Sequence, residues 1–352
     1  MKARIIGSGS YIPPKKQGNC DFEQHEFYEA DGTLITTPLP VIIRKFKAIT
    51  GISERRYANP DLQASDLATI AAKQAIADAN IDPETIDYII LAHNFGNVNP
   101  HSNQGDAVPS LAARVKHTLG INNPRCVAYD LLFGCPGWVE GSIQAQAFIQ
   151  SGLAKRCLVI GTETLSRVVD PHDRDSMIYA DGAGAVIWEA STDESGILSH
   201  GSLSYTKEEA YFIFFGKSNK PGKPEQDRFI KMYGRKIYEF ALTHVPQAIS
   251  ETLEKANIPL EKVAKILIHQ ANEKMDEAIV DRLYKSHNLT APERIMPMSI
   301  GQLGNSSVAT VPTLYDLIKK GELPEHELKS GDVIIFASVG AGMNINAIVY
   351  RC

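Results

Sequence analysis

The chain has 352 residues, of which 43% are hydrophobic and 22% are charged. These values are typical of a globular protein with two domains or one large one, and they exclude a disordered or fibrous chain. The formal net charge of −5 gives no support to wholesale nucleic-acid binding. No apolar run approaches the roughly 18 residues of a membrane span, and the first ten residues contain no signal segment, so we expect a cytoplasmic protein.

The predicted elements alternate between helix and strand along most of the chain. Two stretches interrupt this order, the polar and proline-rich residues 15–47 and the loop at residues 201–228. Strands are expected at Tyr88–Ala92, Arg125–Tyr129, Arg156–Gly161, Val186–Glu189, Lys265–His269, Arg294–Ile300 and Asp332–Ser338. Because helices separate most of these strands, we expect mainly parallel sheets covered by helices.

The sequence contains an internal repeat. Residues 67–94 and 244–271 each hold an amphipathic helix that ends at Ala-Asn-Ile, a short link with a glutamate, and an apolar strand, at a constant offset of 177 residues. A strand, a glycine turn, a helix and a second strand then follow in both halves. The turns are Gly134-Cys135 in the first half and Gly304-Asn305 in the second. A duplicated fold with a pseudo-two-fold axis would therefore bring Cys135, His269 and Asn305 together at its centre.

Cys135 is the best candidate for a nucleophile. It follows a glycine and precedes Pro136, which suits the first turn of a helix. The partial positive charge at a helix N-terminus stabilises a thiolate, so we expect a lowered thiol pKa. A free cysteine is more often a buried structural residue, and this is our interpretation of Cys126 and Cys157 inside apolar strands.

His269 and Asn305 are the other two candidates. His269 ends an apolar strand, where active residues of open α/β sheets gather, and its ring can donate a hydrogen bond or move a proton near pH 7. The alternative for Asn305 is a helix N-cap, a role that Ser306 and Ser307 could also fill. The turn at Gly340-Ala341-Gly342 could present backbone N–H groups as an oxyanion hole, or it could be only a tight turn.

Other chemistries find little support. The five cysteines include no C-x-x-C pair and the ten histidines no H-x-x-x-H pair, so no metal site is expected. The glycine-rich segment 181–185 precedes a strand and does not open a helix, which argues against dinucleotide binding. Arg55-Arg56 and Arg174 could bind phosphates, although an exposed arginine is more often in a surface ion pair.

Taken together, these motifs resemble the β-ketoacyl-acyl carrier protein synthase III family of thiolase-fold condensing enzymes, nearly from end to end. The resemblance includes Ile5–Pro13, Thr50–Arg56, Asp173-Arg174, Asp181–Ala185, Ile268–Asn272 and Gly304–Ser307. It implies an α/β, thiolase-like fold with duplicated βαβαβαββ halves in a five-layered α-β-α-β-α arrangement. The halves are expected at residues 1–200 and 229–352, separated by an inter-half loop at 201–228.

The resemblance also implies a decarboxylative Claisen condensation without a metal or redox cofactor. Cys135 would take an acyl group from a coenzyme A or carrier-protein thioester. His269 and Asn305 would stabilise the enolate formed when a malonyl or related thioester loses carbon dioxide. Backbone N–H groups of Cys135 and Ala341 would form the oxyanion hole. The expected partners are an acyl carrier protein and a second copy of the chain in a homodimer.

Substrate-binding positions of the family fall on Arg174, Gly234, Lys274 and Val108. Lys45 and Ile49 stand where the family has an adenine-stacking tryptophan and its companion arginine, which makes a carrier-protein donor more plausible. Lys274 keeps a basic character suited to an acidic carrier protein. Val108 replaces a phenylalanine that often limits the acyl pocket across the dimer interface, and a smaller residue there could admit longer or branched chains.

Several alternatives to fatty-acid priming remain open at the level of the sequence. One is a specialised ketosynthase of a resorcinol- or polyene-type lipid or polyketide pathway. A second is an acyltransferase without condensation, which His269 and Asn305 argue against, and a third is a non-catalytic heterodimer partner, which Cys135 argues against. A hydroxymethylglutaryl-thioester synthase is disfavoured because no motif supports Glu140 as its base.

Overall fold

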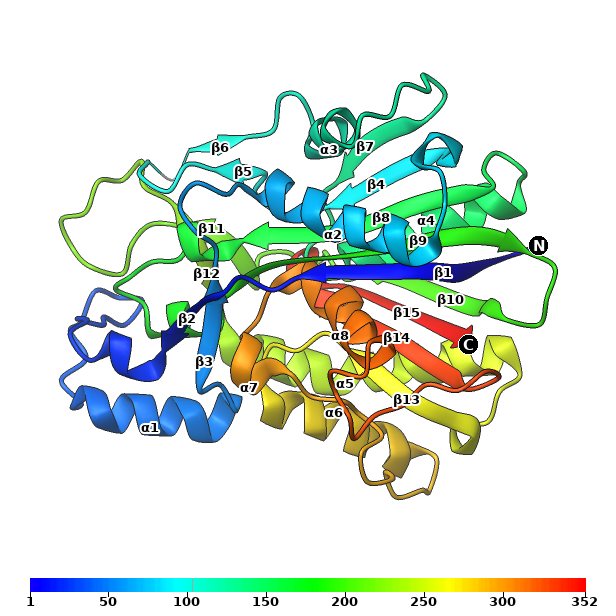
Figure 1. The fold of residues 1–352 in the computed structure, drawn as a ribbon. Coiled ribbons are helices and arrows are strands. Elements are labelled where there is room, and N and C mark those ends of the chain that lie inside the picture. Colours follow the sequence, from blue (N-terminus) through cyan, green and yellow to red (C-terminus); the bar gives the residue numbers. More distant parts are fainter. Residues whose placement is uncertain (103) are drawn as a thin grey trace.

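The computed structural model describes residues 1–102 and 104–352. Two sheets dominate it (Figure 1). The first has the strand order β1 (Lys2–Tyr11), β9 (Asp181–Ser191), β8 (Arg156–Thr164), β4 (Tyr88–Ala92) and β7 (Val127–Leu131). The second has the order β10 (Gly196–Ser204), β15 (Asn344–Arg351), β14 (Val333–Gly340) and β13 (Val263–Ile268).

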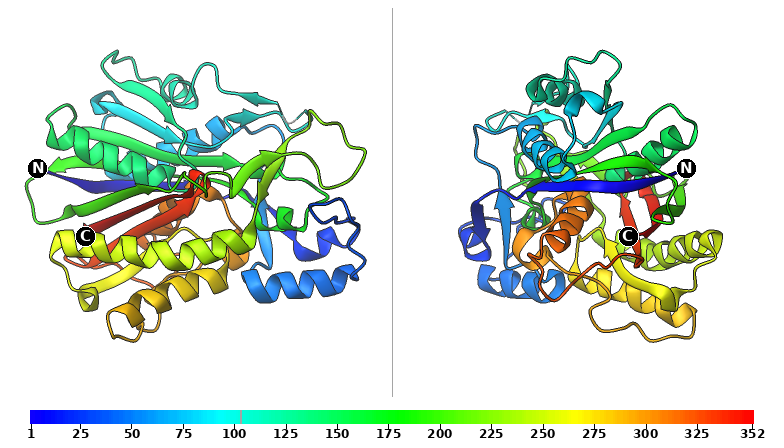
Figure 2. Two further views of the ribbon diagram at one scale, coloured as in Figure 1. Left: turned by 180° about the vertical axis from the view of Figure 1, so that it is seen from behind. Right: turned by 45° about the vertical axis from the view of Figure 1, so that its right-hand side comes forward.

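Helices cover both sheets and fill the space between them. Helices α2 (Ala64–Ala79) and α3 (Leu111–Leu119) pack on the outer face of the first sheet. Helices α5 (Gly234–Ala256) and α6 (Glu273–Ser286) pack on the outer side of the second sheet (Figures 1 and 2). Helices α4 (Gly137–Gln150) and α8 (Thr310–Lys319) contact strands of both sheets. The five-layered, thiolase-like arrangement is therefore confirmed.

The buried faces of these elements follow from their sequences. Alanines at positions 68, 71, 72 and 75 of α2 are fully buried, because their spacing places them on one helix face and their small side chains allow close contact with β1. Strands β8 and β14 are buried along almost their whole length. The apolar runs 157–160 in β8 and 333–337 in β14 are typical of central strands covered on both faces.

The sheets are mixed, so the expectation of mainly parallel sheets is wrong. In the first, β4 is parallel to β7 and β8, whereas β9 is antiparallel to β8 and β1 is antiparallel to β9. In the second, β13 and β14 are parallel, and β15 is antiparallel to both β14 and β10. The antiparallel pair β14–β15 is joined by the short turn 341–343, whereas residues 165–180 connect β8 to β9.

The expected strand at Arg294–Ile300 is also wrong. The segment lies beside β13, where the Ile266 N–H donates to the Ile295 carbonyl at 2.9 Å, but it is assigned to no strand. Pro297 lies within it and Pro292 just before it, and proline has no N–H for a ladder hydrogen bond. The second sheet consequently has four strands where the first has five.

The remaining elements surround one end of the sheets. They are β2 (Lys15–Gly18), α1 (Leu39–Thr50), β3 (Glu54–Tyr57), β5 (Asn97–Val98), β6 (Gly105–Asp106), β11 (Ile213–Gly216), β12 (Phe229–Met232) and α7 (Ile300–Leu303). The structure differs in two ways from the expectation of an inter-half loop at residues 201–228. Strand β10 pairs with β15 and begins at Gly196, before the expected boundary at residue 200, and β11 forms a hairpin with β12.

Candidate active site

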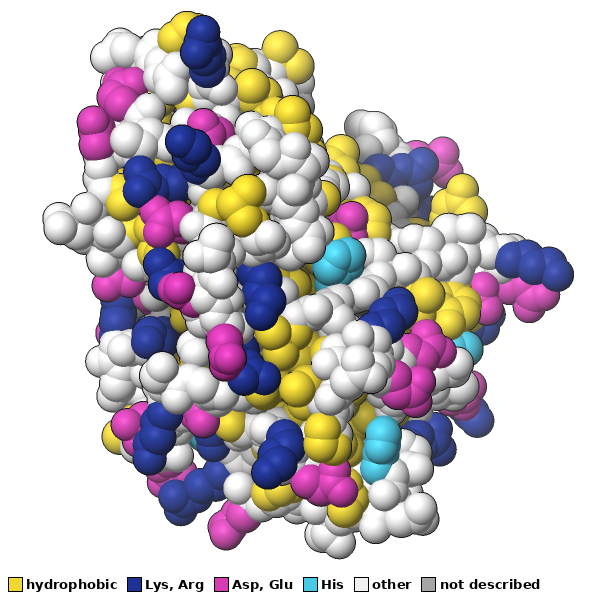
Figure 3. Space-filling view, turned by 90° about the vertical axis from the view of Figure 1, so that its right-hand side faces the viewer, with side chains coloured by type: hydrophobic (Ala, Val, Ile, Leu, Met, Phe, Trp, Pro, Cys, Tyr) yellow, Lys and Arg dark blue, Asp and Glu magenta, His cyan; other side chains and the backbone are white. Residues whose placement is uncertain are grey.

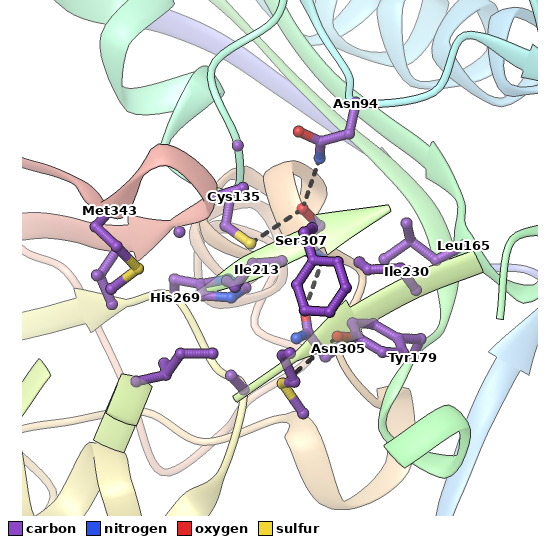
Figure 4. Close-up of a pocket in the computed structure, with 18 of the residues that line it drawn as sticks. Asn94, Cys135, Leu165, Tyr179, Ile213, Ile230, His269, Asn305, Ser307 and Met343 are labelled. Carbon is purple, nitrogen blue, oxygen red and sulfur yellow. Dashed lines mark hydrogen bonds between the residues drawn. The ribbon is translucent and has the colours of Figure 1, made fainter. Parts of the chain in front are cut away.

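Cys135, His269 and Asn305 line one cavity of about 250 Å³ (Figure 4). Cys135 lies on the turn between β7 and α4, and His269 directly follows β13. Asn305 lies between α7 and α8. The structure therefore brings together the three residues that the internal repeat pointed to, from both halves of the chain.

The turn that carries Cys135 depends on two glycines. Gly134 has φ +65°, which favours glycine, and a Cβ atom added there would lie 2.7 Å from the backbone nitrogen of Ala341. A Cβ atom on Gly340 would lie 2.5 Å from the backbone nitrogen of Cys135. The glycines thus let the loop at Ala341 approach the backbone of the Cys135 turn, as an oxyanion hole between these two residues would require.

The thiol pKa differs from the sequence-based expectation. Burial raises the pKa of Cys135 to about 11, a hydrogen bond from Ser307 opposes this shift, and nearby Glu163 adds to it. The expected low thiol pKa is therefore wrong, because the effect of burial outweighs the stabilising contacts around the sulfur. The physical reason is that the sulfur lies in a mostly apolar cavity, where a thiolate loses hydration.

Ser307 links Cys135 to two further polar residues. The Ser307 hydroxyl donates to Cys135 Sγ at 3.3 Å and accepts from Asn94 Nδ2 at 3.1 Å (Figure 4). Asn94 Nδ2 and the Asn94 backbone N–H both donate to Glu163 Oε1, at 2.5 and 2.7 Å. Burial raises the pKa of Glu163 to about 8.

His269 is neutral at pH 7. Burial lowers its pKa to about 4, and a hydrogen bond with the backbone of Ser307 offsets this shift only in part. Its ring atom Nδ1 is buried and has no hydrogen-bond partner among the described residues. A neutral imidazole carries one N–H, so His269 can act as a donor without bringing a positive charge into the cavity.

Asn305 is held so that its amide nitrogen remains available. Its Oδ1 accepts a hydrogen bond of 2.8 Å from the backbone N–H of Ser307. Its own backbone N–H donates to the Ile178 carbonyl at 3.0 Å, and its carbonyl accepts from the Ala180 N–H at 2.8 Å. Because Oδ1 is occupied by a backbone donor, Nδ2 is the group that Asn305 can offer to a ligand. Asn305 therefore stabilises its own turn through Oδ1 and still lines the cavity.

The rest of the cavity wall is mainly apolar. Much of it comes from the β11–β12 hairpin, and Phe95 packs against Phe215 with ring centroids 5.2 Å apart. The apolar wall includes Phe95, Leu165, Phe214, Phe215, Ile230 and Met343. No lysine or arginine of the described residues lines this cavity. Such a wall suits a hydrocarbon chain better than a charged ligand.

The four predicted substrate-binding residues lie outside this cavity. Arg174 and Gly234 line a neighbouring surface depression, where Arg174 Nη1 lies 3.4 Å from Glu29. Lys274 is on the exposed face of α6 and pairs with Glu277 at 2.9 Å. Val108 is 87% exposed, so it cannot limit the acyl pocket of its own chain.

Two other sequence candidates have structural roles. Arg55 is fully buried and donates to the carbonyls of Met177 and Gln17 and to Asn19 Oδ1, so it is unavailable to a phosphate. Glu140 Oε2 accepts from Ser202 and Asn346, each at 2.7 Å, and joins α4 to the second sheet. Glu140 is not among the cavity-lining residues.

Sequence reasoning missed the contribution of Asn94 and Glu163, and it considered Ser307 only as a helix cap. The available signal was their position, because Asn94 follows the end of β4 and Glu163 lies near the end of the neighbouring β8. A glutamate that follows the apolar run 157–160 within one strand indicates a buried carboxyl that needs a partner. The sequence does not show which partner it has.

The surface charges, the metal-ligating side chains and the helices indicate which other functions find no support in the described residues. On the face that carries the two chain ends, Lys and Arg side chains are interspersed with Asp and Glu (Figure 3). Residues 1–102 and 104–352 contain no cluster of three metal-ligating side chains. None of the helices in this part of the chain has the length and apolar character needed to span a bilayer.

Comparisons with known proteins agree with this geometry. Residues 129–204 match the family model for 3-oxoacyl-[acyl-carrier-protein] synthase III, and residues 253–352 match the model for its C-terminal part. The chain is 32% identical to β-ketoacyl-[acyl-carrier-protein] synthase III 1 of Bacillus cereus, over 100% of this chain and 99% of that protein. The crystal structure of the Aquifex aeolicus synthase III superposes with a TM-score of 0.79 at 31% identity, covering 99% of this chain and 100% of that one.

Both comparisons cover 99% or more of the chain and therefore extend over both halves. The Aquifex aeolicus relative is also 32% identical in sequence over the full length of both chains. By these full-length similarities, the chain belongs to the β-ketoacyl-[acyl-carrier-protein] synthase III family of condensing enzymes.

Proposed function

We propose that this protein joins a Cys135-bound acyl group to a malonyl-type carrier-protein thioester by decarboxylative Claisen condensation. The observation that carries the proposal is the meeting of Cys135, His269 and Asn305 in one apolar cavity. A nucleophile, two hydrogen-bond donors and a hydrocarbon-lined wall are the parts that this reaction needs.

In the first half-reaction, Cys135 Sγ attacks the carbonyl carbon of an acyl thioester. A new S–C bond forms, the bond to the donor sulfur breaks, and the Cys135 proton leaves with the departing thiol. The oxyanion that forms on the way is stabilised by the backbone N–H groups of Cys135 and Ala341. The close approach of these two segments, permitted by Gly134 and Gly340, supports this assignment.

In the second half-reaction, the malonyl-type thioester loses carbon dioxide. The electron pair of the broken C–C bond passes into an enolate, whose oxygen accepts hydrogen bonds from His269 and from Asn305 Nδ2. The thioester oxygen takes the hydrogen bond that His269 otherwise shares with the backbone of Ser307. The carbanion then attacks the acyl-enzyme, the S–C bond to Cys135 breaks, and the returning thiolate takes up a proton.

The lack of charge on His269 supports its assignment as a donor and not as a general acid. With a pKa of about 4, the ring stays neutral throughout the physiological range. It therefore need not lose a proton before it can donate its single N–H to the enolate oxygen. Fixed neutral donors in a low-dielectric site stabilise a developing oxyanion without reorganisation.

A homodimer forms part of the proposal. Strand β7 is at the edge of the first sheet, and Val127 and Leu132 at its ends are 45% and 67% exposed. Val108, in the segment before α3, is 87% exposed. An unpaired edge flanked by exposed apolar side chains suits pairing with a second copy. Light scattering should give twice the chain mass, and a stable monomer would contradict this part of the proposal.

The test of the reaction is intact-protein mass spectrometry with a panel of acyl-coenzyme A and acyl-carrier-protein thioesters, short to long. A mass gain on Cys135 that disappears when malonyl-carrier protein is added, with a β-ketoacyl product, would support the proposal. The preferred donor would separate fatty-acid priming from a specialised ketosynthase. An adduct that never condenses would indicate an acyltransferase, and no adduct with any donor would overturn the proposal.

A further inference from the structure

A chain of hydrogen bonds connects Cys135 to a carboxyl group behind the cavity wall. It runs from Glu163 through Asn94 to the Ser307 hydroxyl and ends at Cys135 Sγ, with distances of 2.5, 3.1 and 3.3 Å. Glu163 is 1% exposed and does not line the cavity, whereas Asn94, Ser307 and Cys135 do. The carboxyl group therefore reaches the reaction site only through its neighbours.

The direction of each hydrogen bond in this chain is determined by the one before it. Glu163 Oε1 accepts from both the backbone N–H and the side-chain Nδ2 of Asn94, so the Asn94 amide cannot rotate without losing a bond. The Asn94 amide nitrogen is only a donor, so the Ser307 oxygen must be its acceptor. The single hydroxyl hydrogen of Ser307 is then free to point at Cys135 Sγ.

We propose that Asn94 and Glu163 are positioning residues that hold the Ser307 hydroxyl as a hydrogen-bond donor to Cys135 Sγ and so stabilise the thiolate that attacks the acyl donor. The inference rests on the proposed role of Cys135 as the nucleophile. Ser307 acts as a donor and not as a base, because it keeps its hydrogen while the Cys135 proton leaves with the departing thiol. Hydrogen bonds to a charged acceptor are stronger than those to a neutral one, so Ser307 favours the thiolate over the thiol.

The need for such a donor follows from the groups around the sulfur. The titratable groups that face Cys135 are Glu163, His269 and Tyr179. None is a cation at pH 7, because burial lowers the pKa of His269 to about 4, and no lysine or arginine lines the cavity in the described part of the chain. A thiolate in this cavity therefore has no positively charged partner. Its stabilisation depends on the start of α4 and on neutral donors such as Ser307.

Glu163 suits this role better protonated than ionised. An ionised carboxylate this close to the sulfur would repel a thiolate, and burial keeps the proton on by raising the pKa of Glu163 to about 8. Asp181 is the charged group that acts on Glu163 and raises its pKa further. In either protonation state Oε1 can accept from Asn94, so the orientation of the amide is preserved.

The experiment measures the rate constant for alkylation of Cys135 by iodoacetamide from pH 6 to pH 10 in the full-length protein. Ser307→Ala removes the donor, and we expect its profile to shift to higher pH, with a rate at pH 7 about tenfold or more below that of the wild type. Asn94→Ala leaves the Ser307 hydroxyl free to turn away, so a smaller shift in the same direction is expected. Glu163→Gln should shift the profile less than Ser307→Ala.

Ser306→Ala is the matched control. It removes a hydroxyl one residue away, whose partner at 3.4 Å is Thr310 and not Cys135, and its profile should match the wild type. Asn94→Ala also serves if Ser307→Ala does not fold, because it leaves the Ser307 backbone, with φ +54°, unchanged. Thermal unfolding identifies variants that do not fold.

Two results would overturn the inference. One is an unchanged profile in Ser307→Ala and Asn94→Ala. The other is a loss of rate in Ser306→Ala as large as that in Ser307→Ala, which a general disturbance of this turn would give. Wild-type protein whose Cys135 resists alkylation across the whole range would instead contradict the proposed function. Because alkylation needs no thioester, the failure of the inference and the failure of the proposed reaction are distinguishable.

Discussion

The two halves of the molecule use the same backbone devices to hold different chemistry. Asn80 after α2 and Asn257 after α5 both have left-handed backbone, with φ of +50° and +53°, at the offset of 177 residues found in the sequence. Gly134 and Gly304 have φ of +65° and +69°, and the next residues are Cys135 and Asn305. The duplicated fold thus supplies two corresponding turns, and the residue after the glycine is a nucleophile in the first turn and a hydrogen-bond donor in the second.

The ends of β8 and β14, in contrast to the turns, differ between the two halves. Leu91 of β4 pairs with Ile160 of β8, and Ile268 of β13 pairs with Ala337 of β14, so the same offset of 177 residues places Gly340 at the position of Glu163. The first half has a buried carboxyl there, which reaches Cys135 through Asn94 and Ser307. The second half has a glycine, which lets the Ala341 loop approach Cys135. The duplicated fold explains why Glu163 and Gly340 lie at corresponding positions, and their different side chains explain their different roles.

The largest loss of activity is expected from replacing Cys135. Cys135→Ala should abolish the acyl-enzyme and reduce condensation by on the order of 10⁴-fold or more, because no other thiol lies in the cavity wall described here. Mass spectrometry after incubation with an acyl thioester measures it, with Cys157→Ala as the control. A covalent acyl adduct that persists in Cys135→Ala would refute the assignment of the nucleophile.

The second half should govern condensation and not acylation. His269→Ala should still form the acyl-enzyme but lose condensation by on the order of 10²- to 10³-fold, because an oxyanion donor is removed from a water-poor site. The two steps are measured separately, by mass gain and by carbon dioxide release from the malonyl-type thioester. Equal losses in both steps would show that His269 does not act in the second half-reaction alone.

The turns at Gly134 and Gly304 can be compared by the free energy of unfolding of their alanine variants. Gly134→Ala should lower the free energy of unfolding by about 2–4 kcal/mol, because the new Cβ atom meets the Ala341 backbone at 2.7 Å in a left-handed conformation. Gly304→Ala should behave alike, since its Cβ atom would lie 2.6 Å from Arg55 Cβ. Gly152→Ala, with φ +77° and open space, is the control and should cost about 1 kcal/mol. Urea unfolding measures all three, and equal losses would mean that the close approach adds nothing.

The smallest effect is expected on the pH dependence of stability, and it concerns Glu163, whose carboxyl group has no counterpart in the second half. The pKa of Glu163 is about 8 in the folded state and near 4.5 when unfolded, so the folded protein binds more protons between these values. Its contribution to stability is therefore complete below about pH 4.5 and falls as pH rises toward 8. The free energy of unfolding of Glu163→Gln, measured by urea unfolding, should therefore rise relative to that of the wild type as the pH increases from 4.5 to 8. A constant difference at all pH values would show that Glu163 does not titrate in this range.

Much of the fold could be predicted from the sequence. The repeated helix–turn–strand unit is visible because its hydrophobic period changes from helix to strand and its helices stop at Asn80 and Asn257, both in left-handed backbone. The strand at Tyr88–Ala92 is confirmed with the same bounds, and the bounds of the others, apart from Arg294–Ile300, shift by a few residues. The failure at Arg294–Ile300 has a local cause, because hydrophobicity there favours a strand while Pro292 and Pro297 remove ladder donors.

By itself, the sequence determined the duplicated architecture, the family resemblance and the position of Cys135, His269 and Asn305, because these depend on local periodicity, turn residues and symmetry. Only the tertiary structure decided the environment of the sulfur. The pKa of Cys135 rises because residues distant in sequence enclose it, and Asn94, Glu163 and Ser307 meet through three separate segments. Burial and hydrogen-bond direction are properties of the packed molecule, and no local pattern of residues contains them.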